Sequence, residues 1–143
     1  MRRIIAGIAS LGLIGGVGSV VYNNHGATVR IRGSNGQMQS VHIGFGKHRY
    51  ECPSGESQKL NPLVIREGRI KLTMKDVVAE LRRLKAKPPG AHASRQAIAR
   101  YNAVVPRYNA ALRRARRLGS AFDATAHQYN AIIDSDCTAA SGG

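Results

Sequence analysis

The chain has 143 residues, with 22 lysines and arginines against 8 aspartates and glutamates, for a net charge of +14. Only 5% of the residues are aromatic and there is no tryptophan, which excludes a large, well-filled core and leaves room for one domain. The positive charge favours anionic neighbours, namely nucleic acid, anionic lipid head groups or acidic envelope polymers. The abundance of alanine, arginine and glycine is typical of a high-GC bacterial genome.

The N-terminus has the layout of an export signal. Arg2 and Arg3 precede an uncharged run over residues 4–22. As a helix this run would measure roughly 28 Å, close to the hydrocarbon thickness of a bilayer. It predicts either a cleaved signal peptide or a signal-anchor helix over residues 1–23, with the rest of the chain outside the cytoplasm. The choice between cleavage and anchoring stays open, because no strong cleavage motif follows the run.

Residues 27–51 predict a small β element. Apolar residues alternate with polar ones on both sides of a glycine-containing turn. A three-residue loop over residues 34–36 pairs Val29 with Val41 and places both apolar sets on one face, whereas a two-residue turn would place them on opposite faces. Gly36 then supplies the left-handed residue of the turn. The segment is therefore expected to form a β-hairpin, with a third strand as an option at its C-terminal end.

Two heptad patterns predict an antiparallel helical hairpin. The first helix is expected over residues 61–87, before a Pro-Pro-Gly stop, or alternatively from residue 73. The second is expected over residues 93–136 as one long helix, with a kink at Pro106 and a weak point at Gly119. Its apolar or small residues recur every seven positions, at Ile98, Val105, Leu112, Gly119, Ala126 and Ile133.

The long helix also carries a short repeat, Tyr-Asn-Ala or Phe-Asp-Ala, that begins at residues 101, 108, 122 and 129. All copies share one heptad phase, which favours packing of the aromatic rings over an exposed adhesive stripe. The first helix is long enough to cover the second only to about residue 118. The remainder needs another cover, either the β-hairpin or a second copy of the chain.

The two cysteines predict a disulfide. Cys52 lies just before the first helix and Cys137 just after the second, so an antiparallel hairpin brings both to the same end. An oxidising compartment outside the cytoplasm would permit the bond. It would close a loop of 85 residues and could stabilise the fold by about 4–5 kcal/mol.

No pattern in the sequence indicates catalysis or a cofactor. There is no nucleophile motif, phosphate loop, dinucleotide fingerprint or evident pair of catalytic carboxylates. The histidines are not spaced as metal ligands, because none lies three or four residues from another. We therefore expect no catalytic residue, no metal site and no enzymatic activity. The histidines are His25, His42, His48, His92 and His127.

Clustered arginines are the most suggestive polar feature. One cluster flanks Ala115 on the long helix, and another ends the first helix. Arginine suits bidentate contact with phosphate or carboxylate. The alternative interpretation is a solvated helix face. The candidate anion-binding residues are Arg82, Arg83, Arg113, Arg114, Arg116 and Arg117.

These features predict a mainly α protein with a small β element. An N-terminal membrane or signal helix would precede an exported domain over residues 24–137 and a flexible tail over residues 138–143. The predicted function is a non-enzymatic, membrane-tethered interaction module of the cell envelope. Its partner would be anionic lipid head groups, an acidic envelope polymer or another protein, and a homodimer could form through the heptad seam. The alternatives are an extracytoplasmic nucleic-acid-binding protein and a secreted cationic membrane-active effector.

Overall fold

The structure is a computed structural model that describes residues 8–9, 17–46, 49–85 and 88–139. The chain divides into two compact units. We call residues 1–72 and 122–143 the sheet unit, and residues 73–121 the helical unit. Two long helices contribute to both units, and each unit is described by itself.

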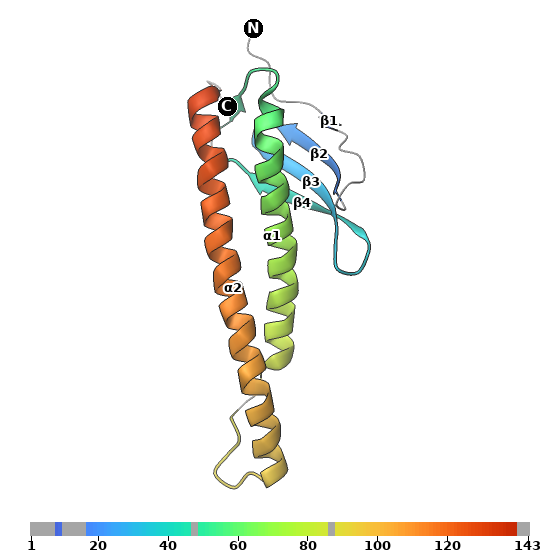
Figure 1. Ribbon diagram of the computed structural model, residues 1–143, viewed down its shortest axis with the longest axis vertical. Coiled ribbons are helices and arrows are strands. Elements are labelled where there is room, and N and C mark those ends of the chain that lie inside the picture. The colour runs from blue at the N-terminus through green and yellow to red at the C-terminus, as the bar shows by residue number, and fades with distance from the viewer. Residues whose placement is uncertain (1–7, 10–16, 47–48, 86–87, 140–143) are drawn as a thin grey trace. The chain divides into compact units, whose positions relative to one another are not determined.

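The sheet unit contains an antiparallel four-stranded sheet in the order β1-β2-β3-β4 (Figure 1). Its strands are β1 (Ile8–Ala9), β2 (Val17–Asn23), β3 (Gly26–Arg32) and β4 (Met38–Gly44). A second, two-stranded sheet pairs β5 (Tyr50–Glu51) with β6 (Thr138–Ala139). Among the described residues, strands therefore precede the two helices, and one short strand follows them.

The predicted fold class is wrong at the N-terminus, where strands come first and a membrane or signal helix was expected. In β2, Val20 and Tyr22 are buried while Val21 is 40% exposed, an alternation with the period of a strand. β-Branched valines pack well on a pleated surface, and glycines weaken a helix. Once β3 is present as a pairing partner, this composition favours a strand.

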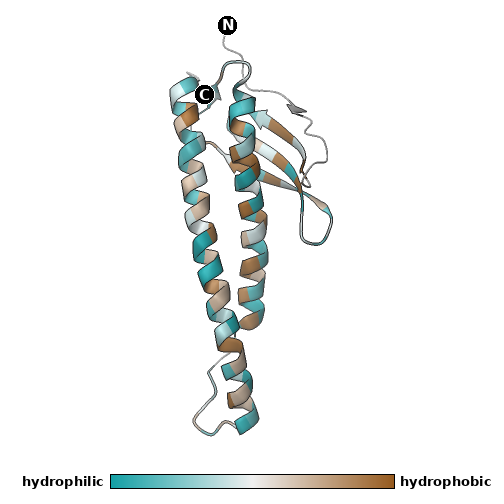
Figure 2. Ribbon diagram, viewed as in Figure 1, coloured by the Kyte–Doolittle hydropathy of each residue, from teal (hydrophilic) through white to brown (hydrophobic). Residues whose placement is uncertain are grey.

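No helix among the described residues is both long and apolar enough to cross a bilayer. In Figure 2, hydrophobic residues recur along both helices between hydrophilic ones. The expected single-pass helix is not among the helices that the structure describes. Most of the expected signal segment, residues 1–7 and 10–16, lies outside the described residues, whereas Val17–Asn23 belongs to the sheet.

The predicted register of the β-hairpin is confirmed. Val29 pairs with Val41, and Gly36 has a φ of +80° in the loop. A third strand was an option at the C-terminal end of the hairpin segment. A strand does form there, β5, but it pairs with β6 and does not extend the hairpin. Part of the expected flexible tail, Thr138–Ala139, is thereby ordered as a strand directly after Cys137.

The first helix, α1 (Glu56–Leu84), begins before either expected start. The turn at Gly55, which has a φ of +98°, leads directly into the helix. Glu56 places an acidic side chain in the first turn, a position that the helix dipole favours. Pro62, which directly follows the earlier of the two expected starts, lies inside the helix.

The second helix, α2 (Arg95–Asp136), begins two residues after the expected start. Ser94 caps it, since its hydroxyl accepts a hydrogen bond from the amide of Ala97 at 3.2 Å. Pro106 is accommodated within the continuous helix.

The core of the sheet unit lies where the sheet meets α1 and α2. Gly68 of α1 lies close to β3, because a Cβ atom there would lie 2.6 Å from Cδ1 of Ile31. Phe45 packs between Tyr22 and Tyr129, with ring centroids at 6.4 and 5.6 Å. The β element therefore covers this end of α2, which is one of the two covers that the sequence left open. The largest fully buried side chains here are Leu60, Ile133, Glu67, Val20, Val29, Val64 and Cys52.

Two side chains from the helices contact β4, the edge strand of the sheet. Lys71 of α1 donates a hydrogen bond from Nζ to the carbonyl of His42 at 2.7 Å. The hydroxyl of Tyr129, in α2, donates to the carbonyl of Gly44 at 3.2 Å. The ammonium group of Lys71 also lies 5.8 Å from the ring centroid of Phe122, a cation–π contact.

Candidate anion-binding surface

The helical unit carries most of the positive charge of the protein. In sequence it has twelve lysines and arginines against two carboxylates, Asp76 and Glu80, or +10 of the total +14. The six arginines predicted as anion-binding residues all belong to this unit. Each is exposed: Arg82, Arg83, Arg113, Arg114, Arg116 and Arg117.

Four arginines of α2 lie on the side of the helix away from its packed seam, whereas Arg116 lies nearer to the seam. At 3.6 residues per turn, Arg113 and Arg117 lie opposite the seam residue Ala115. Arg107 and Arg114 are one heptad apart, or about 10 Å along the helix axis. Both are exposed, and they extend the row in the direction of the N-terminus. We call Arg107, Arg113, Arg114 and Arg117 the arginine face of α2.

The residues that separate these arginines are small. On the same side of α2, Ala103, Pro106 and Ala110 are exposed. Such residues leave the guanidinium groups accessible and supply no large apolar side chain. None of the four arginines of the face forms an ion pair with a described residue. The surface can therefore offer several forked donors to an anion at once.

The helical unit also contains a groove of about 370 Å³ next to the end of α1. The first two tyrosines of the heptad repeat line it, and both are half-buried. The tyrosine rings are thus only partly packed here, whereas Tyr129 in the sheet unit is buried. The groove is lined by Leu84, Lys85, Tyr101, Val104, Val105, Tyr108 and Asn109.

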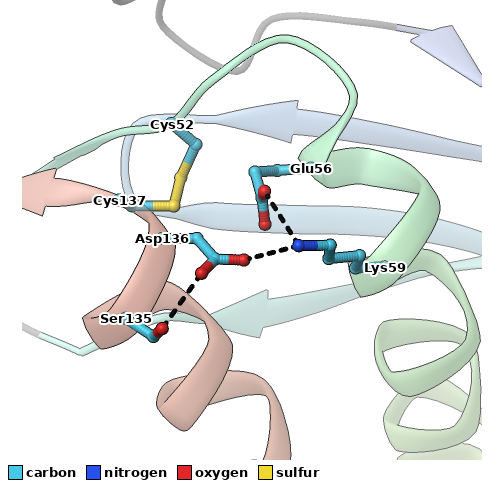
Figure 3. A network of polar contacts seen from close by, with 6 residues as sticks. All are labelled: Cys52, Glu56, Lys59, Ser135, Asp136 and Cys137. Atoms are coloured by element: carbon cyan, nitrogen blue, oxygen red, sulfur yellow. Dashed lines mark hydrogen bonds and ion pairs between the residues drawn. A yellow bond between two sulfur atoms is a disulfide. The ribbon is translucent and has the colours of Figure 1, made fainter.

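A network of polar contacts lies beside the disulfide in the sheet unit (Figure 3). The predicted bond between Cys52 and Cys137 is confirmed, with Cα atoms 4.3 Å apart. Lys59 Nζ lies 2.9 Å from Asp136 Oδ2 and 3.6 Å from Glu56 Oε1. A disulfide is typical of a protein that folds in an oxidising compartment.

The two carboxyl groups around Lys59 respond oppositely to their surroundings. Burial raises the pKa of Glu56, and the neighbouring Asp136 raises it further. A hydrogen bond from Lys59 lowers the pKa of Asp136. The network thus joins the first turn of α1 to the last turn of α2.

Glu67 is the most unusual acidic residue in the sheet unit. Its side chain is fully buried, and neither carboxylate oxygen makes a hydrogen bond within the described structure. Burial raises its pKa to about 7, against opposing effects of Lys71 and the Tyr129 hydroxyl, while Asp123 adds to the increase. The same environment raises the pKa of Tyr129 to about 12, mainly through burial. Glu67 is therefore partly protonated near neutral pH.

The four histidines in the described part of the chain belong to no cluster of metal-ligating side chains. No group of three or more metal-ligating side chains occurs in the part of the chain that the structure describes. His25, His42, His92 and His127 are exposed, and His42 Nδ1 lies 2.9 Å from the hydroxyl of Thr28. His48 lies outside the described residues.

Neither the burial of Glu67 nor the contacts of Glu56 and Asp136 with Lys59 are among the predictions from the sequence. For Glu67 a signal was present, because it follows Leu60 and Val64 in steps of four and three and so occupies the apolar face of α1. For Asp136 there was none, since its partner Lys59 is 77 residues away in sequence.

Comparison of the chain with protein-family models, with curated proteins and with solved structures gave no match.

Proposed function

We propose that this protein is a non-enzymatic, extracytoplasmic module that binds a linear acidic polymer of the cell envelope along the arginine face of α2. The observation that carries this proposal is the concentration of charge, twelve basic residues against two acidic ones in the helical unit. A surface that needed charge only for solubility would be served equally well by a mixture of both signs. The excess of one sign favours an anionic partner.

The arrangement of the arginines favours an extended partner. Arg107, Arg114 and Arg117 follow the helix axis in a row, so a chain with regularly repeated carboxylates or phosphates can contact several of them together. Each contact is forked and charge-assisted, which makes arginine a better ligand than lysine for planar anions.

The residues among the arginines argue against a bilayer surface as the partner. Helices that lie on membranes insert tryptophan, phenylalanine or leucine next to their basic residues. The exposed neighbours on this face are Ala103, Pro106 and Ala110, which have little to insert.

Two further observations favour an envelope polymer over nucleic acid. The disulfide between Cys52 and Cys137 is typical of a chain that folds outside the cytoplasm. Single strands of nucleic acid are held partly by stacking on exposed aromatic rings. Tyr101 and Tyr108 are half-buried around the groove and lie away from the arginine face.

The test measures binding of the full chain to heparin, alginate, duplex DNA and vesicles with anionic head groups, each over a series of salt concentrations. The four-fold variant Arg107→Gln, Arg113→Gln, Arg114→Gln, Arg117→Gln should bind the polysaccharides about tenfold or more weakly, with a shallower salt dependence. A matched control removes four exposed arginines from the sheet unit, Arg30, Arg32, Arg49 and Arg66.

The control variant has the same net charge as the test variant and should retain most of the affinity. Equal losses in the two variants would show that total charge, and not the arginine face, determines binding. If the chain binds vesicles or DNA but not the polysaccharides, the proposal is overturned and the partner is a lipid surface or nucleic acid.

A further inference from the structure

The first part of α2 presents an apolar seam that its own partner helix leaves open. The last helical residue of α1 is Leu84, and the groove lies beside it. Ile98, at the first seam position of α2, is 42% exposed. Tyr101, Val105 and Tyr108 continue the seam and are half-buried. Four consecutive seam positions are therefore incompletely covered within the helical unit.

The spacing of these residues indicates what kind of surface would cover them. Steps of three and four residues place apolar side chains in one row along a helix, and this row is the contact surface for another helix. Binding of a sugar chain or an isolated small molecule would not require apolar side chains at this three-and-four spacing. A groove of about 370 Å³ beside the seam can accept the apolar anchor side chains of such a helix.

The charge of the unit indicates the character of that helix. A second copy would bring another +10 unit, calculated from twelve basic and two acidic residues, against the first. This repulsion disfavours self-association through the seam. An acidic helix would instead be attracted, and Lys85, which is exposed at the rim of the groove, is placed to contact its carboxylates.

We propose that the groove and seam of the helical unit, from Leu84 and Lys85 to Tyr101, Val105 and Tyr108, bind an amphipathic, acidic α-helix of a partner protein. The apolar anchors of that helix enter the groove, and its carboxylates contact Lys85. Asn102 and Asn109 directly follow the two tyrosines and offer hydrogen bonds at the side of the seam. This site is distinct from the arginine face, so one molecule could join an acidic polymer to an acidic protein.

The experiment uses the full chain and two synthetic peptides as probes. The first peptide has four heptads with leucine at the two seam positions and glutamate at most others. The second has the same composition with the heptad order scrambled. Fluorescence anisotropy and circular dichroism at physiological salt report affinity and helix formation. The ordered peptide should bind about tenfold or more tightly than the scrambled one and gain helix on binding.

Two charge reversals locate the site. Lys85→Glu should weaken binding of the ordered peptide at least about threefold more than Lys75→Glu does, because only Lys85 lines the groove. The two variants have equal net charge, and both lysines are exposed residues of the helical unit. Val105→Glu places a charge in the groove and should abolish binding of the ordered peptide. If Val105→Glu loses its helical circular dichroism signal, the comparison of Lys85→Glu with Lys75→Glu decides the question.

Equal affinity for the two peptides would overturn the proposal, since binding would then depend on charge alone. Equal effects of Lys85→Glu and Lys75→Glu would also overturn it. If the chain alone sediments as a dimer and Val105→Glu sediments as a monomer, the seam binds a second copy of the chain instead of an acidic helix. The four-fold variant of the arginine face should bind the ordered peptide with an affinity within about threefold of that of the control variant, which has the same net charge but lacks Arg30, Arg32, Arg49 and Arg66 of the sheet unit. Such similar affinities would separate this site from the polymer site.

Discussion

The Nζ atom of Lys59, near the start of α1, lies 2.9 Å from Oδ2 of Asp136, the last residue of α2. The next residue is Cys137, whose disulfide partner Cys52 lies four positions before Glu56. An ion pair and a covalent bond thus hold the same two segments together. For a chain with few aromatic residues, this link is an important source of stability.

We expect loss of the disulfide to destabilise the fold by about 4–5 kcal/mol at most, because it removes the constraint that an 85-residue loop places on the unfolded chain. Urea unfolding with and without a reductant measures the difference, and Cys52→Ser with Cys137→Ser should match the reduced protein. Two alkylated thiols in protein purified without reductant, or an unchanged unfolding midpoint, would contradict this expectation.

Glu67 should make stability depend on pH. Its pKa is about 7 in the folded chain, against an ordinary value of 4.5. Between these values the unfolded chain releases a proton that the folded chain keeps, so the free energy of unfolding falls as pH rises through this window and then levels off. The whole effect is at most about 3 kcal/mol.

Glu67→Gln should remove this part of the pH dependence and be more stable than the natural chain at pH 8. Chemical denaturation at several pH values between 4 and 8 tests the prediction. Asp134→Asn, which changes an exposed carboxylate of α2, is the matched control and should keep the natural profile. Parallel curves for Glu67→Gln and the natural chain would show that Glu67 does not cause the dependence.

The two glycines inside the helices should respond in opposite ways to alanine. A Cβ atom added at Gly119 would have no neighbouring atom within 4 Å, so Gly119→Ala should stabilise by roughly 0.5–1 kcal/mol through helix propensity. Gly68→Ala places a methyl group 2.6 Å from Ile31 Cδ1 and should destabilise by roughly 1–2 kcal/mol.

Shortening Ile31 should relieve that contact. The double variant Gly68→Ala, Ile31→Val should be more stable than the sum of the two single changes predicts, by about 1 kcal/mol. Thermal or urea unfolding of the four proteins gives this coupling energy. Simple additivity would indicate that Gly68 does not contact β3.

Neighbouring valines test whether residues 17–23 form a strand. Val20 is fully buried and Val21 is 40% exposed. Val20→Ala should therefore cost about 2 kcal/mol, and Val21→Ala should change stability by less than about 0.5 kcal/mol. Similar effects of the two substitutions on urea unfolding would be inconsistent with the alternating burial of β2.

The hairpin register could be predicted from the sequence because a strand has a period of two. Only an odd loop places Val29 and Val41 on the same face, and both are buried there. The disulfide could be predicted because Cys52 and Cys137 flank the two helices. The register follows from local spacing, whereas the disulfide follows from the antiparallel arrangement of the two helices, which brings two residues 85 positions apart to the same end.

The N-terminal strand could not be predicted in the same way. An uncharged run rich in valine, isoleucine and glycine suits a bilayer and also suits a sheet that is partly buried. The choice depends on pairing with β3, which the run itself does not encode. The burial of Glu67 is likewise determined by contacts between segments, although its position on the apolar face of α1 was visible.

The contacts of Lys71 and Tyr129 with β4 affect how the protein behaves at high concentration. Unpaired carbonyl groups on an edge strand are a template on which a strand of another molecule can add. The carbonyl groups of His42 and Gly44 are already occupied by side chains from the helices. The helices therefore protect the sheet from growing into an intermolecular β structure, and partial detachment of α1 or α2 would expose an aggregation-prone edge before the strands themselves unfold.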